Sequence, residues 1–250
     1  MKIILSPAKN MREADDCPSY ETMPVFLEQT EILLEKMRSM NRDELKQMWN
    51  CSDSLAEKNA DRLEYMNLRS RLTPALFAYT GLAFQHISAG AMTETQLAYL
   101  RDHLYILSGF YGVLRPFDGI VPYRLEMQAV MPEAGDLYTF WNSRIHDEIC
   151  DNDKVIVNLA SKEYSQCLSR YLKEDERMIT CVFAKLKNGK PVSGGTKAKM
   201  ARGDMVWWLS ENGTEDPEDM KKFAQGYTYS ETLSSETEYV FLEKGEQRDE

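Results

Sequence analysis

The sequence predicts a mixed α/β fold, with helices around a mixed central sheet in a single compact domain over residues 1–250. The apolar runs Lys2–Leu5 and Val155–Leu159 are short and end abruptly in polar residues, as buried strands do. Between Pro24 and Leu63 the apolar residues instead follow helical spacing. No repeat or Pro/Gly-rich linker divides the chain, which favours one domain.

Two strands are expected at Lys2–Leu5 and Val155–Leu159, because both runs are too short for helices. A third strand is expected at Ile179–Lys187, which leads into Asn188-Gly189, a dipeptide suited to a tight hairpin turn. The tail 245–250 is highly charged, and we expect it to fray.

Two or three amphipathic helices are expected between Pro24 and Leu63, one of them starting near Ser52. Thr93-Glu94-Thr95-Gln96 has the form of a capping box, and leucines follow at spacings of three and four. This pattern predicts a helix that runs to Leu107 and stops at Ser108-Gly109.

Composition excludes several classes of protein. The apolar run near the start is too short for a signal peptide, and no stretch approaches the ~20 apolar residues of a spanning helix, so we expect a cytoplasmic protein without a membrane anchor. The 5 cysteines are scattered and the 3 histidines isolated, so no disulfide scaffold, metal centre or cofactor is expected. A net charge of −10 argues against broad attraction to nucleic acid but leaves room for a local basic cleft.

The segment 185–203 is the clearest charge feature, because it holds several basic residues and no acidic one. Its basic residues are Lys185, Lys187, Lys190, Lys197, Lys199 and Arg202. Such a segment suits a cleft for a phosphate backbone. The alternative is an ordinary cationic face that balances acidic neighbours.

The stretch Leu107–Val113 carries Gly109 and Gly112 in the h-x-G-h-x-G-h pattern of a helix-hairpin-helix element. Backbone amides in such a hairpin can hold a nucleic-acid phosphate. Arg115-Pro116, which comes next, makes an immediate second helix awkward.

Polar residues also follow both predicted strands, at the edge where open α/β sheets bind ligands. These residues are Ser6 and Lys9 after the first strand, and Asn158, Ser161, Glu163 and Tyr164 at the second. Arg124 and Glu126 add a further pair beside Tyr123, in which Arg124 binds phosphate with Glu126 as its orienting partner. The alternative is that Ser6 and Ser161 cap turns or helices and that Lys9 and Glu163 are solvated. Arg124 and Glu126 would then form a structural ion pair. No nucleophile elbow, phosphate-binding P-loop or dinucleotide fingerprint is present.

Six ordered blocks, spread from Ser6 to about Phe241, together resemble the peroxide stress protein YaaA family. They are Ser6-Pro7-Ala8-Lys9; Ser52-Asp53 with Leu55-Ala56 and Asn59; Leu107-Ser108-Gly109 with Tyr111-Gly112-Val113-Leu114-Arg115-Pro116; Pro122-Tyr123-Arg124-Leu125-Glu126-Met127; Asn158-Leu159-Ala160-Ser161 with Glu163-Tyr164; and Lys199 with Ala201-Arg202-Gly203 and Met205.

The resemblance implies a cytoplasmic protein that helps bacteria survive hydrogen peroxide by lowering available iron and so limiting radical damage to DNA. It also implies a single α/β fold with a helix-hairpin-helix element and a basic cleft that binds DNA. The shared polar positions are Ser6, Lys9, Arg115, Arg124, Glu126, Asn158, Ser161, Glu163, Tyr164, Lys199 and Arg202. Trp207 departs from the pattern, since a basic residue is expected there in many relatives.

The leading hypothesis is a protein that associates with double-stranded or distorted DNA without turnover. Phosphates would be neutralised by cations and held by the amides of Gly109 to Gly112, and shape rather than sequence would be read. The candidate cations are Lys9, Arg115, Arg124, Lys199 and Arg202. The alternative is an enzyme acting on a nucleotide or nucleic acid, with Glu126 or Glu163 as general base. Convergence of these residues in a closed pocket favours the enzyme, and an open groove favours DNA association.

Overall fold

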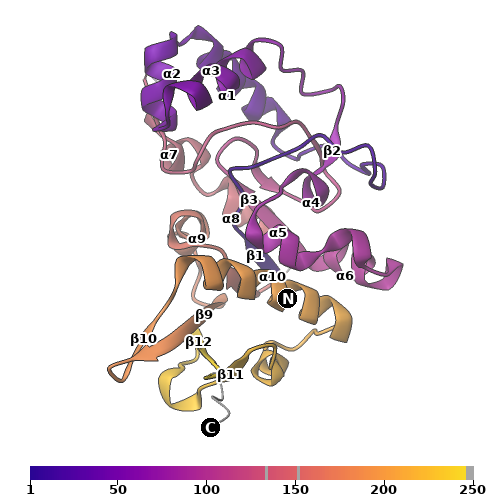
Figure 1. The fold of residues 1–250 in the computed structure, drawn as a ribbon, viewed down its shortest axis with the longest axis vertical. Helices are drawn as coiled ribbons and strands as arrows, with labels where there is room; N and C mark the ends of the chain where they lie inside the picture. The colour runs from indigo at the N-terminus through magenta and orange to yellow at the C-terminus, as the bar shows by residue number, and fades with distance from the viewer. Residues whose placement is uncertain (133–134, 151–152, 246–250) are drawn as a thin grey trace.

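The computed structural model describes residues 1–132, 135–150 and 153–245. A central sheet has the strand order β11-β12-β9-β8-β1-β3-β4 (Figure 1). Its strands are β1 (Lys2–Leu5), β3 (Leu104–Ser108), β4 (Gly112–Leu114), β8 (Val155–Leu159), β9 (Arg177–Lys187), β11 (Tyr227–Tyr229) and β12 (Glu238–Glu243). The strands from β12 to β3 run parallel, and β4 and β11 close the two edges antiparallel. The predicted α/β class with a mixed central sheet is confirmed.

The three strands expected from the sequence are confirmed. β1 lies between β3 and β8, and Ile3, Ile4 and Leu5 are at most 1% exposed. A strand that is covered on both faces must be apolar at consecutive positions, which explains its unbroken apolar run.

Three helices form at the N-terminal end as expected: α1 (Leu27–Ser39), α2 (Arg42–Trp49) and α3 (Asp53–Glu64), shown at the top of Figure 1. α2 begins with a reciprocal capping box between Asn41 and Glu44. The remaining helices are α4 (Ala75–Ala78), α5 (Leu82–Ile87), α6 (Glu94–His103), α7 (Leu137–Trp141), α8 (Arg144–Ile149), α9 (Lys162–Ser169) and α10 (Gly195–Asn212), with 3-10 turns at Ala89–Ala91, Pro217–Lys222 and Glu231–Leu233. No helix in the described part of the chain is long and apolar enough to cross a membrane.

The helix predicted from Thr93 to Leu107 is wrong at its C-terminal end. Its capping box is confirmed, but α6 stops at His103, and Leu104 takes an extended conformation that opens β3. β3 pairs with β1 and buries Leu104 and Leu107 completely. Leucines at spacings of three and four fit a helix. Pairing of β3 with β1 nevertheless satisfies the backbone hydrogen bonds of this segment and buries the same leucine side chains.

The predicted helix-hairpin-helix element at Gly109 and Gly112 is also wrong, because Gly109 lies in the turn between the antiparallel strands β3 and β4 and Gly112 is the first residue of β4. Gly112 has φ +72°, a conformation that favours glycine. A Cβ on Gly109 would lie 2.5 Å from the carbonyl oxygen of Leu125. Both glycines are buried, and the turn amides of Phe110 and Tyr111 donate to Ser108 Oγ.

The hairpin at Asn188-Gly189 is confirmed, with φ +52° and +73° at these two residues. It joins β9 to β10 (Lys190–Val192), and the two strands project from the body at the lower left of Figure 1. We call residues 185–192 the basic ribbon. The remaining short strands pair as β2 (Thr73–Pro74) with β5 (Gly119–Ile120) and β6 (Val130–Met131) with β7 (Gly135–Asp136). The tail expected to fray lies outside the described residues except for Gly245.

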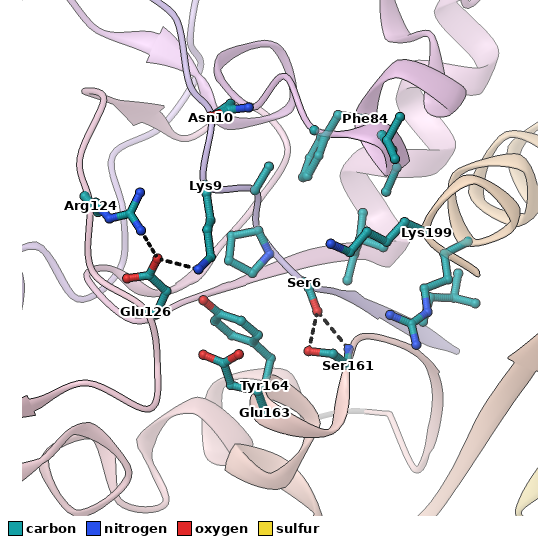
Figure 2. A pocket seen from close by; sticks show the side chains of 18 of the residues that line it. Ser6, Lys9, Asn10, Phe84, Arg124, Glu126, Ser161, Glu163, Tyr164 and Lys199 are labelled. Carbon is teal, nitrogen blue, oxygen red and sulfur yellow. Dashed lines mark hydrogen bonds and ion pairs between the residues drawn. The ribbon is translucent and has the colours of Figure 1, made fainter. Parts of the chain in front are cut away.

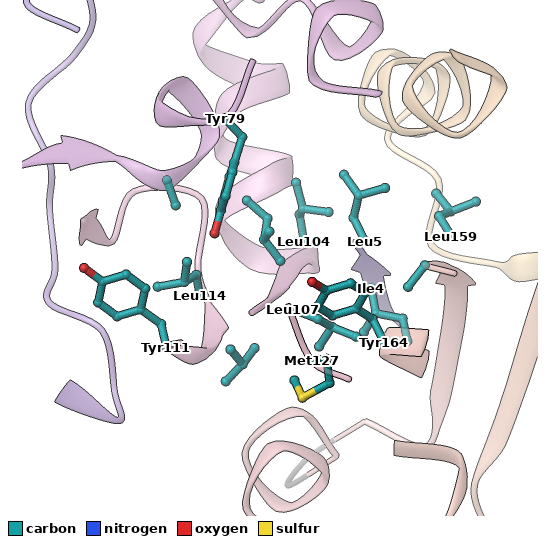
Figure 3. Packing of buried hydrophobic residues seen from close by; sticks show 14 of the residues in the cluster. Ile4, Leu5, Tyr79, Leu104, Leu107, Tyr111, Leu114, Met127, Leu159 and Tyr164 are labelled. Atoms are coloured by element: carbon teal, nitrogen blue, oxygen red, sulfur yellow. The ribbon is translucent and has the colours of Figure 1, made fainter. Parts of the chain in front are cut away.

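The core around β1 joins residues from distant parts of the chain, among them Leu5, Tyr79, Leu107 and Leu159 (Figure 3). A chain of buried hydroxyl groups crosses it: Tyr123 Oη lies 2.7 Å from both Ser108 Oγ and Tyr79 Oη. Burial raises the pKa of Tyr123 to about 12. These bonds fix the segment that carries Arg124 and Glu126.

Candidate functional site

A pocket of about 370 Å³ opens at the carboxyl ends of β1 and β8 (Figure 2). It is walled by the loop after β1, the start of α5, the segment 123–126, the start of α9 and one face of α10. Nine of the residues singled out from the sequence line it: Ser6, Lys9, Arg124, Glu126, Ser161, Glu163, Tyr164, Lys199 and Arg202.

The floor of the pocket consists of two serines that the parallel pairing of β1 with β8 brings together. Leu5 pairs with Leu159, so the residues that follow each strand end are neighbours. The Ser161 N–H donates to Ser6 Oγ at 2.8 Å, and the Ser6 hydroxyl donates to Ser161 Oγ at 3.3 Å. Ser161 is the N-cap residue of α9 but makes no capping bond with its own side chain, which leaves its hydroxyl at the pocket.

One wall carries an ion-pair group of three residues. Glu126 Oε1 lies 3.2 Å from Lys9 Nζ and 3.0 Å from Arg124 Nη2. Arg124 and Glu126 are nearly buried, with side chains 11% and 13% exposed, whereas that of Lys9 is 65% exposed. Arg124 Nε is buried without a hydrogen-bond partner among the described residues. The group has one surplus positive charge.

Glu163 faces the same pocket without a cation at ion-pair distance in the described part of the chain. Burial raises its pKa, and the negative charge of Glu126 adds to this effect, against a weak hydrogen bond of 3.4 Å from the Gln128 N–H and the charge of Lys9. Burial likewise raises the pKa of the neighbouring Tyr164. The Tyr164 hydroxyl is therefore protonated at neutral pH.

The opposite wall is cationic. Lys199 and Arg202 are three residues apart on α10 and so lie on the same face of the helix, and Figure 2 shows Lys199 across the pocket from Arg124. Arg202 has no ion pair in the described residues, and its Nε is buried without a hydrogen-bond partner. Burial lowers the pKa of Arg202. A largely buried guanidinium without a counter-charge is the strongest sign that this wall receives an anion.

Gly203 sets the position of this cationic wall. α10 packs against α5 so closely that a Cβ on Gly203 would lie 2.2 Å from the carbonyl oxygen of Ala83. Only glycine permits this approach, which brings Arg202 next to the carboxyl ends of the strands.

Other predicted site residues lie outside the pocket. Arg115 Nη2 pairs with the buried Asp118 at 3.1 Å and also donates to the Met23 carbonyl. Asn158 is 3% exposed; its Oδ1 accepts from the Ala160 N–H and its Nδ2 donates to Thr180 Oγ1. Trp207 is on α10 but does not line the pocket. Arg115, Gly109 and Gly112 thus lie outside this pocket, and their contact with DNA stays a prediction.

The apolar part of the lining, which includes Leu82, Phe84 and Leu125, was not predicted from the sequence. Nothing in their spacing separates them from ordinary core residues, because only the packing of α5 against the strand ends brings them here. The described residues that line the pocket include no histidine or cysteine.

Comparisons with known proteins give a consistent picture. A family model described as "Peroxide stress protein YaaA" matches residues 1–233. A curated UPF0246 protein of Agathobacter rectalis is 46% identical over 247 residues, covering 98% of this chain and 99% of that protein. A UPF0246 protein of Lachnoclostridium phytofermentans is 45% identical over 249 residues, covering 98% and 97%, and one of Pediococcus pentosaceus is 44% identical over 245 residues, covering 97% and 98%. With a match that extends over most of the chain, this protein belongs to the peroxide stress protein YaaA family.

Proposed function

We propose that the protein acts in the cytoplasm during the bacterial response to hydrogen peroxide, and that it associates with DNA and limits iron-dependent damage to it. The observation that carries the proposal is the convergence of four cations in one pocket with only two carboxylates. The cations are Lys9, Arg124, Lys199 and Arg202. This leaves the lining with a net positive charge inside a chain of net charge −10.

The size of the pocket limits how DNA enters it. A volume of about 370 Å³ is in the range of small-molecule sites and is too small for a duplex. One nucleotide that has left the base stack fits such a site. Distorted DNA, in which a base is already unpaired, loses less stacking energy when that base enters the pocket.

The lining suggests how that nucleotide lies. Its phosphate belongs beside Arg202 and Lys199, where positive charge is uncompensated. Its base belongs against the apolar wall formed by Leu82, Phe84 and Leu125. The hydroxyl groups of Ser6 and Ser161 line the same pocket, where either is available to a sugar or phosphate oxygen.

The basic ribbon supports a second, sequence-independent contact. Lys185, Lys187 and Lys190 are exposed there, and Lys187 and Lys190 lie directly opposite each other across the two strands. Like charges in that arrangement repel, and a phosphate backbone relieves the repulsion. Such contacts position a protein on DNA without reading its sequence.

The test is fluorescence anisotropy with a labelled duplex that carries one unpaired nucleotide and with the fully paired duplex. We expect tighter binding to the first probe and a salt dependence that corresponds to roughly three to six phosphate contacts. Arg202→Ala and Lys199→Ala should each weaken binding to the unpaired probe by about tenfold, while the exposed control Lys58→Ala leaves it unchanged.

Three results would overturn the proposal: no binding at low salt, binding that is indifferent to salt, or full binding by Arg202→Ala. Equal affinity for the two probes would contradict the entry of an unpaired nucleotide. The thermal midpoints of the variants show whether any loss of binding reflects unfolding.

A second candidate is an enzyme acting on a nucleotide or nucleic acid, favoured by the convergence of the site residues in one pocket and by Glu163, the half-buried carboxyl with a raised pKa. Glu163→Gln separates the two candidates. A protein that only binds keeps its DNA affinity and its peroxide protection, because removing a carboxylate lessens the repulsion of phosphate. An enzyme keeps its affinity but loses protection, because its general base is gone.

A further inference from the structure

A second group of reactive side chains lies at the opposite edge of the sheet, at the amino ends of β8 and β9. It consists of His146 on α8, Cys150 directly after that helix, and Glu176 directly before β9. One ligand atom from each lies within 4.8 Å of the other two. His146 is 1% exposed, Cys150 3% and Glu176 9%.

The ring of His146 is held in one orientation by a carboxylate. Its Nδ1 lies 2.9 Å from Asp147 Oδ1, and the Ser143 hydroxyl donates to Asp147 Oδ2 at 2.7 Å. This places Nε2 within the cluster. Metal-binding histidines are oriented in the same way, with the second ring nitrogen bonded to a carboxylate.

The remaining contacts of the cluster involve Glu176. His146 Nε2 lies 2.7 Å from Glu176 Oε2, which also accepts from the Lys173 N–H at 2.9 Å. Its other oxygen, Oε1, is buried without a hydrogen-bond partner in the described part of the chain, and it lies 3.8 Å from Lys154 Nζ and 3.9 Å from Lys173 Nζ. These two lysine side chains are 48% and 61% exposed, so both ammonium groups are able to swing away into water.

We propose that His146, Cys150 and Glu176 form a binding site for one divalent transition-metal ion of the Zn²⁺ type. A nitrogen, a sulfur and an oxygen donor suit such ions, whereas Mg²⁺ and Ca²⁺ require oxygen ligands. A thiolate and a carboxylate together carry two negative charges, which neutralise a divalent ion at a buried position. Water, or the unpartnered Glu176 Oε1, completes the coordination.

Binding exchanges protons for the metal. Both ring nitrogens of His146 face carboxylate oxygens, so a proton lies between Nε2 and Glu176 Oε2 in the metal-free protein. The metal ion takes the place of that proton and of the Cys150 thiol proton, and both leave to solvent. No electron is transferred.

The test uses the full chain freed of metal. We expect one equivalent of Co²⁺ to give a thiolate-to-cobalt charge-transfer band, Zn²⁺ to displace Co²⁺, and excess Mg²⁺ to have no effect. Cys150→Ala should abolish the band, and the matched control Cys167→Ala, which removes another buried thiol, should keep it.

Asp147→Asn provides a second variant that spares the fold, because the Asp147 side chain is 58% exposed. It should weaken Zn²⁺ binding by about 10–100-fold, since it changes the partner that orients His146. No stoichiometric Co²⁺ or Zn²⁺ binding by the native chain would overturn the proposal, as would equal binding by Cys150→Ala. Circular dichroism of each variant shows that the fold is retained.

Discussion

Gly203→Ala tests whether the packing of α10 on α5 positions the cationic wall. The added Cβ would lie 2.2 Å from the Ala83 carbonyl oxygen and 2.6 Å from His86 Cβ, where ordinary contacts begin at 3.4 Å. The helices must therefore separate by about 1.2 Å, the difference between 3.4 and 2.2 Å. In a helix alanine is otherwise favoured over glycine by about 1 kcal/mol.

Overpacking of this kind costs about 1–3 kcal/mol. For a chain of this size, that cost corresponds to a fall of about 2–12 °C in thermal midpoint. Because the shift moves Arg202, binding to the unpaired-nucleotide probe should weaken together with stability.

The matched control is Gly195→Ala in the first turn of the same helix, where an added Cβ has nothing within 4 Å. Urea unfolding followed by circular dichroism gives the free energy of unfolding of each variant. The reasoning is refuted if Gly203→Ala unfolds at the same urea concentration as Gly195→Ala.

Two further predictions concern charged groups. Burial raises the pKa of Glu163 above its ordinary value of 4.5, so the folded protein holds the carboxyl proton more tightly than the unfolded chain does. The protein therefore loses stability as the pH rises from 4.5 through the folded-state pKa of Glu163. Glu163→Gln should therefore raise the urea midpoint at pH 7, with the gain shrinking as the pH falls towards 4.5; a gain that is independent of pH would contradict this. Arg115→Ala removes the ion-pair partner of the buried Asp118 and should lower the free energy of unfolding by about 3 kcal/mol. The folded variant should bind DNA like the native chain. Weakened binding with unchanged stability would instead show that Arg115 contacts DNA.

The strand-end residues of the site were predictable because β1 and β8 are neighbours in a parallel arrangement. Apolar runs at both strands indicated burial on two faces, so Ser6 and Ser161 were expected at the ligand-binding edge of the sheet, and the pairing of β1 with β8 makes them neighbours. The cations of α10 were predictable from an acid-free segment. Which of the basic residues of this segment line the pocket and which lie in the basic ribbon was not predictable. That depends on where the hairpin ends and where α10 begins.

Other parts of the structure depend on contacts that no local pattern contains. The leucines from 97 to 107 suit a helix and a strand equally, and only β1 decides where α6 ends. Two glycines three residues apart suit a β-turn as well as a helical hairpin. His146 and Cys150 are four residues apart, yet no metal centre was expected from the sequence, because Glu176 joins them only through the pairing of β8 with β9.

The short strands at the two edges of the sheet have a consequence for the behaviour of the protein in a crowded cell. β4 and β11 are 3 residues long each, and every residue of β4 is buried. Each edge of the sheet therefore presents few unpaired backbone N–H and C=O groups to a second molecule. This limits aggregation by edge-to-edge strand pairing. The short strands β4 and β11 thus cover β3 and β12, the outermost parallel strands, which would otherwise be able to pair with another chain and aggregate.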